Sequence, residues 1–364
     1  MRGYGSTVHR TPLCDLLGID VPIVLAGMAG GMTTPQLVAA VSEAGGLGTF
    51  GAAGMSVEGL QAAVKQAKSL TNKPIGVNVL LADPTPPRGD AEPVERAVEV
   101  LRDRLGVGRS EGSAASPSGP ELVKAGLAAG ADVVATGLGD PAPVVEMARR
   151  HGAPMVAMVA TVADAEQAIA SGADALVAQG GEAGGHRSNF TVQDDGTVPI
   201  VGTMALVPQV VDAVDAPVIA AGGIMDGRGL VAALALGAQG VQVGTRFLTT
   251  SESGIPDSYK RRVTEARDTD TVITTSVSGR PARGIRNTLI ETMDAVEPSN
   301  LGYPRQQAAT GPVRSEGMKR GDDELVALWA GQAAGLARSG SAAAVVAQIV
   351  AEADRIVRRL GAGD

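Results

Sequence analysis

The chain has 364 residues, which is too long for one minimal domain and short for three. Hydrophobic residues make up 44% of it but aromatic residues only 2%, so the sequence can fill a large core that must be mostly aliphatic. The formal charge of -8 leaves no basic face to neutralise phosphates, and this argues against nucleic acid as a partner.

A weak internal repeat runs along the chain, in which a helix-like stretch ends at a small-residue turn and a short apolar run follows. The glycine of the turn suits the residue just beyond a helix, and the apolar run suits a strand buried on both faces. With the remaining apolar runs, the pattern predicts eight strands, at residues 22–26, 47–50, 75–80, 132–136, 155–159, 175–179, 218–221 and 240–243.

Helix-like patterns lie between most of these strands. Alternating strands and helices indicate a parallel sheet, and eight repeats favour a closed (β/α)8 barrel, or TIM barrel, over an open sheet. Such a barrel takes roughly 250 residues. We therefore predict a barrel over residues 1–275 and a C-terminal extension over residues 276–364 that packs on the barrel and its site.

Three segments depart from a minimal barrel. Residues 83–120, between the third and fourth strands, contain a helix-like run at 93–105 and a polar Gly/Ser stretch, and we predict an insertion there. Residues 180–204 predict a long Gly-rich loop after the sixth strand. The extension ends in an amphipathic helical pattern, whose apolar residues are Val346, Ile349, Val350, Ala353, Ile356, Val357 and Leu360.

Glycines follow the seventh and eighth predicted strands, at Gly222 and Gly223 and again at Gly244 before Thr245. In a barrel the loops after the strands build the site, and glycines there let the backbone approach a ligand and present N–H groups to an anion. These glycines could simply form tight turns. Their pairing after the last two strands favours a phosphate site.

Asn78 and Gln179 are polar residues near the ends of otherwise apolar strands. A side-chain amide both donates and accepts hydrogen bonds, which suits the pyrimidine edge or the ribityl hydroxyls of a flavin. The alternative is a buried amide that bonds to nearby backbone.

His186 is the histidine best placed for chemistry. It follows Gly180–Gly185, a loop that we expect to be flexible and to lie at the catalytic face, and an imidazole can exchange a proton beside a cofactor near neutral pH. His9 lies in the N-terminal arm, and His151 suits the C-terminus of a helix. The alternative for His186 is an exposed loop residue without a role.

Residues 137–142 match the spelling of a dinucleotide-binding fingerprint, but no acidic residue ends a strand about twenty residues later. We expect this run to be the fourth βα loop, with Pro141 at the start of the helix. No histidine pair or carboxylate cluster has metal-ligand spacing, so no metal site is predicted.

Cys14 is the only cysteine, which excludes an internal disulfide and a thiolate metal cluster. Residues 1–20 carry no apolar run typical of a signal peptide, and no segment has the length and purity of a membrane span. We therefore expect a cytoplasmic protein without a membrane partner.

Together these residues resemble the nitronate monooxygenase (2-nitropropane dioxygenase-like) family of FMN-dependent barrels. The resemblance runs from about Pro22 to residues 329–332 and is most specific at 181–186, 220–224 and 242–247; residues 278–283 and Asn287 also fit. It implies His186 as the active-site base. It implies that FMN is bound by Ala26, Gly27, Met28, Asn78, Gln179, Gly184, Gly185, Gly222, Gly223, Gln242, Val243, Gly244 and Thr245.

The implied reaction is the oxidation of an alkyl nitronate, or of a neutral nitroalkane, by O2 to an oxo compound and nitrite. His186 would take the proton next to the nitro group of a nitroalkane. A preformed nitronate needs no base, and a protonated His186 would instead attract it. The small-molecule substrate and O2 are the expected partners, and a homodimer stays open.

The family resemblance leaves alternatives. FMN-dependent enoyl-acyl-carrier-protein reductases and some NADH:quinone reductases share the barrel, the flavin site and an equivalent histidine. An NADH-dependent reductase of enoyl thioesters or quinones is therefore the rival function, and a flavin-binding protein without turnover is a third.

Two positions depart from the family pattern. Gly27 stands where the family usually has Pro, which predicts a less rigid wall of the flavin site. Ser188 stands where Gly is common, which predicts a different loop shape or a hydroxyl offered to the substrate.

Overall fold

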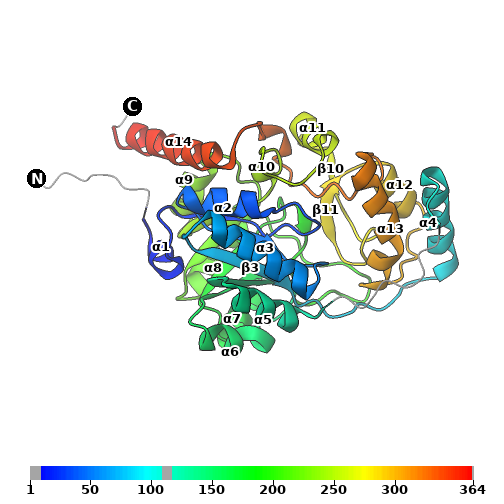
Figure 1. Ribbon diagram of the computed structural model, residues 1–364, viewed down its shortest axis with the longest axis horizontal. Helices are drawn as coiled ribbons and strands as arrows, with labels where there is room; N and C mark the ends of the chain where they lie inside the picture. Colours follow the sequence, from blue (N-terminus) through cyan, green and yellow to red (C-terminus); the bar gives the residue numbers. More distant parts are fainter. Residues whose placement is uncertain (1–9, 109–116, 363–364) are drawn as a thin grey trace, which may run out of the picture.

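The computed structural model describes residues 10–108 and 117–362. Within these residues, eight parallel strands surrounded by helices lie beside a small three-stranded sheet (Figure 1). Each of the eight predicted strands agrees with the observed one to within one residue at either end. The observed strands are β1 (Ile23–Leu25), β2 (Gly48–Gly51), β3 (Ile75–Leu80), β4 (Val133–Gly137), β5 (Met155–Val159), β6 (Ala175–Gln179), β8 (Val218–Ala221) and β9 (Gly240–Val243).

The eight strands close into a barrel. Their order in the sheet is β1-β9-β8-β6-β5-β4-β3-β2, and a parallel bridge between Val24 and Leu47 joins the two ends. The Leu25 N–H donates to the Leu47 carbonyl oxygen at 2.8 Å, and the Leu47 N–H donates to the Ile23 carbonyl oxygen at 2.9 Å. The predicted (β/α)8 TIM barrel is confirmed.

Helices cover the outside of the barrel, and several begin at a side chain that caps the first turn. Thr34 accepts from the Leu37 N–H and Thr161 from the Asp164 N–H, which satisfies donors that the helix itself leaves unpaired. The helices between the strands are α2 (Pro35–Glu43), α3 (Val57–Leu70), α5 (Gly119–Ala129), α6 (Ala142–Arg150), α7 (Val162–Ala170), α8 (Thr203–Ala213) and α9 (Gly227–Ala235). A first helix, α1 (Pro12–Leu17), packs Leu13 and Leu17 against strand residues.

The last helix, α14 (Ala342–Ala362), completes the ring around the barrel. It packs against α9, which precedes the last strand, and against α2, which follows the first (Figure 1). It therefore occupies the place of the eighth barrel helix. Val346 and Ile349 of its predicted apolar face are buried in the main core, whereas Leu360 is 66% exposed.

The insertion folds together with the C-terminal extension, residues 276–364, which is called the tail below. Helix α4 (Ala91–Leu105) lies beside α12 (Thr288–Asp294) and α13 (Arg305–Arg320) in Figure 1, and their buried side chains share one apolar cluster. The insertion after the third strand and the C-terminal helical extension are thus confirmed, and they form one unit. Residues 109–116 of the insertion, like residues 1–9 and 363–364, lie outside the described residues.

The small sheet joins this unit to the barrel. Strand β11 (Ala282–Ile285) pairs antiparallel with β10 (Thr271–Thr274) on one side and with β7 (Gly185–His186) on the other. The loop after the sixth barrel strand therefore contains a short strand that the sequence did not predict. The domain division at residue 275 stays a prediction.

The remaining helices of the described residues are α10 (Thr245–Leu248), α11 (Asp257–Glu265) and the 3-10 helix η1 (Ala334–Leu336). The run at residues 137–142 is the loop between β4 and α6, as expected. In the part of the chain that the structure describes, no helix is long and apolar enough to cross a membrane.

Candidate active site

A cavity of about 640 Å³ lies at the carboxyl ends of the barrel strands, with residues of the tail on its other side. One predicted site residue, Val243, is buried in β9 and is not part of the lining. The other predicted residues all line the cavity, namely Ala26, Gly27, Met28, Asn78, Gln179, Gly184, Gly185, His186, Gly222, Gly223, Gln242, Gly244 and Thr245.

His186 is held on β7 and bonds to the tail. Its Nε2 lies 2.8 Å from the Ser278 hydroxyl oxygen. That hydroxyl donates its single proton to the Arg280 carbonyl oxygen at 3.1 Å, so the network assigns the imidazole proton to Nε2, which donates to Ser278. Nδ1 of the neutral ring therefore keeps its lone pair and can accept a proton.

The surroundings of His186 favour its neutral form. Its pKa is lowered from 6.5 to about 4, first by burial and then by the positive charges of Arg280 and Arg314. The imidazole is therefore neutral above about pH 4. A protonated His186 that attracts an anion, one of the two roles expected from the sequence, does not agree with this pKa.

Two arginines fix the Gly-rich loop that leads to His186. Arg187 is 1% exposed and donates to the Gly180 carbonyl oxygen at 2.7 Å and to the Gln179 carbonyl oxygen at 2.8 Å. Arg283 donates from Nε to the Gly181 carbonyl oxygen at 2.9 Å. The guanidinium groups therefore anchor the start of the loop to the protein, and its flexibility stays a prediction.

The glycines of this loop serve close packing. A Cβ atom on Gly184 would lie 2.5 Å from the carbonyl carbon of Ala330, which is much closer than real contacts allow. The loop and the tail thus touch backbone to backbone. The contact holds the tail, including Trp329, over the barrel mouth.

The two strand-end amides have different surroundings. Gln179 donates to the His186 carbonyl oxygen and accepts from the Ser188 N–H, both at 2.9 Å, so it fixes the backbone on either side of the histidine. Asn78 is 7% exposed, and its Oδ1 has no hydrogen-bond partner among the described residues. Because a buried carbonyl oxygen rarely stays unpaired, we expect the Asn78 Oδ1 to accept a hydrogen bond from a ligand.

The two departures from the family pattern both lie at this cavity. A Cβ atom on Gly27 would lie 2.5 Å from the Asn78 Cβ and 2.8 Å from the Phe50 carbonyl oxygen, so the glycine brings the first loop close to Asn78. Ser188 is buried and lines the cavity. A less rigid wall and a hydroxyl contact to substrate stay predictions.

The turn after β8 has the geometry of an anion cradle. Gly222 and Gly223 have φ of 110° and 72°, a region that residues with a side chain rarely adopt. The backbone N–H groups of Gly223 and Gly244 donate to no other described residue. Thr245, beside Gly244, accepts from the Gly331 N–H at 3.0 Å and so connects this end of the cavity to the tail.

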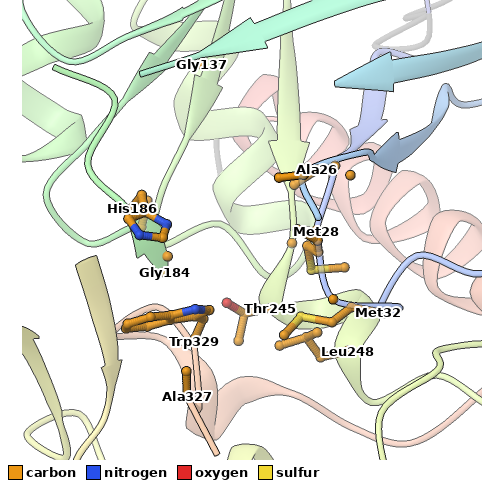
Figure 2. A pocket seen from close by; sticks show the side chains of 18 of the residues that line it. Ala26, Met28, Met32, Gly137, Gly184, His186, Thr245, Leu248, Ala327 and Trp329 are labelled. Carbon is orange, nitrogen blue, oxygen red and sulfur yellow. The ribbon is translucent and has the colours of Figure 1, made fainter. Parts of the chain in front are cut away.

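The opposite wall comes from the tail. The Trp329 ring centroid lies 5.6 Å from that of His186, with the planes tilted by 54°. Figure 2 shows these two rings on one side of the cavity and the apolar side chains of Met28, Met32 and Leu248 on the other. The charged residues among the lining side chains are Arg314 and Lys319 of α13, and no Asp or Glu of the described residues lines the cavity.

Sequence reasoning did not assign roles to Trp329, Ser278 or Arg314. The first two lie in segments that the family resemblance covers, but a segment match does not say which side chain reaches the cavity. Arg314 was not singled out at all, because its helix is polar on several faces and the cavity-facing one cannot be recognised from spacing alone.

Known proteins similar to this chain carry related names. Residues 10–352 match the family model described as Nitronate monooxygenase. A "Probable nitronate monooxygenase" of Staphylococcus saprophyticus is 38% identical over 360 residues, which covers 96% of this chain and 99% of that relative. A solved structure of nitroalkane oxidase from Streptomyces ansochromogenes has a TM-score of 0.85 at 35% identity, covering 96% of this chain and all of that one. FabK from Thermotoga maritima has a TM-score of 0.80 at 33% identity, covering 98% of this chain and 99% of that one.

Proposed function

The chain belongs to the nitronate monooxygenase family and is a flavin-dependent oxidoreductase, and we propose that it oxidises alkyl nitronates with O2 to an oxo compound and nitrite. The observation that carries this proposal is the charge of the cavity. Its lining contains a histidine that is neutral above about pH 4, a partly buried arginine and, among the described residues, no carboxylate. Such a cavity suits an anionic substrate beside a proton acceptor.

We propose FMN as the flavin. The unpaired Asn78 Oδ1 suits the N–H of a flavin ring, and the free N–H groups of Gly223 and Gly244 suit a single phosphate. When bound, the flavin supplies the electron chemistry, and the protein supplies position and electrostatics. Contacts from the other predicted cofactor residues stay part of the proposal. Among them, Gln179 uses its side-chain amide in hydrogen bonds to the loop around His186.

The remaining side chains of the cavity have two proposed roles, proton transfer and packing against the substrate. His186 is the proposed base for a neutral nitroalkane, whose proton would move from the carbon next to the nitro group to Nδ1. A base is most effective when its pKa lies near the working pH, and a pKa of about 4 makes His186 a weak one. A nitronate has already lost this proton and is therefore the better substrate. Met28, Met32 and Leu248 would pack against its alkyl part.

An NADH-dependent reductase of enoyl thioesters or quinones is the second candidate, because such enzymes share the barrel, the flavin site and an equivalent histidine with the family. A cytoplasmic location and a homodimer stay predictions from the sequence. The two candidate activities differ in what reduces the flavin, so spectroscopy can separate them.

The test uses the purified yellow protein in the absence of air. We expect an alkyl nitronate to change the flavin absorbance and expect NADH, added at the same concentration, to leave it oxidised over the same period. Rapid bleaching by NADH together with no response to the nitronate would contradict the proposed function and support the reductase.

A further inference from the structure

Arg314 is a cation built into the wall of the cavity. It lies on the face of α13 that lines the cavity, together with Gln307, Gly311 and Met318. Its Nε donates to the Thr310 hydroxyl at 3.1 Å, and its Nη2 donates to the Gln307 carbonyl oxygen at 2.9 Å. The guanidinium is therefore held in one position by its own helix.

The charge of Arg314 is not neutralised by the protein. No carboxylate of residues 10–108 and 117–362 forms an ion pair with it, and burial is the cause that lowers its pKa, to about 10, so it stays protonated at neutral pH. Nη1 has no hydrogen-bond partner among those residues. Arg314 is partly buried, and taking a charge out of water without a partner is costly, so its place at the cavity indicates an anionic ligand that would pair with it.

The position of Arg314 relative to His186 shows where such a ligand would lie. Its charge is one of the two that lower the pKa of the imidazole, and both side chains line the cavity. The other arginine that acts on His186, Arg280, does not line the cavity, and its Nη atoms donate to the carbonyl oxygens of Asp83 and Asn189. Lys319 is exposed, and its Nζ lies 3.8 Å from the Glu316 Oε2, which partly neutralises its charge.

We propose that the Arg314 guanidinium binds the negatively charged nitro group of the nitronate and holds it beside His186. This inference rests on the proposed function and names the residue that would recognise its substrate. A nitronate carries its charge on two oxygen atoms of one planar group, and a guanidinium binds such a group through charge-assisted hydrogen bonds. A neutral nitroalkane offers much weaker acceptors, so Arg314 selects the anion.

The test compares anion binding and turnover in the FMN-loaded protein. Nitrite serves as the probe because it is a planar anion with two oxygens and can be titrated without turnover. Binding is followed by flavin absorbance and by the fluorescence of Trp329, which lines the cavity and is the only tryptophan of the chain. The variants are Arg314→Met and, as the matched control, Arg320→Met, which removes an equal charge from the same helix at a residue that does not line the cavity.

We expect Arg314→Met to raise the Kd of nitrite and the KM of the nitronate by about tenfold to a hundredfold, with a smaller change in kcat. The KM of a neutral nitroalkane should change less, and Arg320→Met should behave as the wild type. If Arg314→Met does not retain its flavin, Arg314→Gln, which also removes the charge, is measured in its place.

Nitrite Kd and nitronate KM within about twofold of the wild type in the charge-removing variant would overturn the proposal, because that change corresponds to less than one charged hydrogen bond. The experiment distinguishes a failure of the role proposed for Arg314 from a failure of the proposed function. Normal nitronate turnover with unchanged nitrite binding overturns the role of Arg314 alone. Nitrite binding that depends on Arg314, in a wild type that does not oxidise nitronates, supports the anion site and contradicts the oxidation.

Discussion

His186 lies beside Ser278 and Trp329, and its pKa is lowered first by burial and then by the charges of Arg280 and Arg314. The folded-state pKa lies below the ordinary value of 6.5, at about 4. Between these two values the unfolded chain binds a proton at His186 and the folded chain does not, so the stability contributed here falls as the pH falls. Any rate that needs the neutral imidazole should likewise decline as the pH drops through about 4, and not through 6.5.

The change His186→Asn tests this role. We expect turnover of a neutral nitroalkane to fall by about a hundredfold, the lower end for a positioned base, because the carbon acid must lose a proton first and a pKa of about 4 makes His186 a weak base. Turnover of a preformed nitronate should fall much less. Initial rates against pH for both substrate forms, in wild type and variant, provide the check. Equal losses for the two forms would mean that His186 does not act as a base.

A second prediction for a single residue concerns Gly223. With φ of 72°, the change Gly223→Ala strains the backbone, and the strained turn carries an N–H group of the proposed phosphate cradle. Gly152→Ala is the matched control, since its φ is 64°, its Cβ would meet open space and it does not line the cavity. Both variants should lose stability of order 1 kcal/mol, but Gly223→Ala alone should lose flavin.

Mass spectrometry identifies the cofactor released from the wild type. The flavin-to-protein ratio of the two variants measures the loss of flavin. FMN in the wild type and equal ratios in the two variants would mean that the cradle lies elsewhere. FAD in the wild type would contradict the choice of FMN.

At the scale of elements, the tail has two separate places in the fold. Its final helix α14 packs between α9 and α2 as the eighth helix of the barrel, while α12 and α13 form the small unit with α4. The order of the barrel is thus interrupted after β9 by the segments that cover the cavity. The sequence predicted the helix, its apolar face and packing of the extension on the barrel, but not the place between α9 and α2, because an amphipathic pattern indicates the buried face and not the elements that cover it.

Ile349 and Leu360 test the position of α14. Ile349 is 1% exposed within the main core, so Ile349→Ala should lower the free energy of unfolding by about 2–5 kcal/mol. Leu360 is 66% exposed on the same predicted face, and Leu360→Ala should change stability by less than about 0.5 kcal/mol. Urea denaturation of both variants compares them. Similar small effects would mean that α14 does not pack on the barrel.

The strands and the barrel could be predicted from the sequence because several apolar runs follow a turn that contains glycine, as β6 follows Gly172. Most of the residues proposed to bind the flavin and its phosphate could be predicted because they lie at the ends of those strands. The tail side of the cavity could not. Arg314 and Trp329 reach it through contacts between segments distant in the chain, and no local pattern in the sequence records such contacts.

At the scale of the whole molecule, the barrel and the tail supply different halves of one site. The barrel contributes the strand-end residues of the proposed flavin site, and the tail contributes Trp329, Ser278 and Arg314. His186 belongs to both, because β7 leaves the barrel and pairs with β11 of the tail. The proposed oxidation of an anionic substrate therefore depends on the two parts remaining packed together.

Oxygen uptake and nitrite release in air, measured with an alkyl nitronate and the FMN-loaded protein, test the proposed oxidation. We predict that the nitronate drives oxygen consumption and nitrite formation without any added reductant, at a rate well above that of the parent nitroalkane at the same concentration. Oxygen consumption that requires NADH, with no nitrite formed from the nitronate, would contradict it.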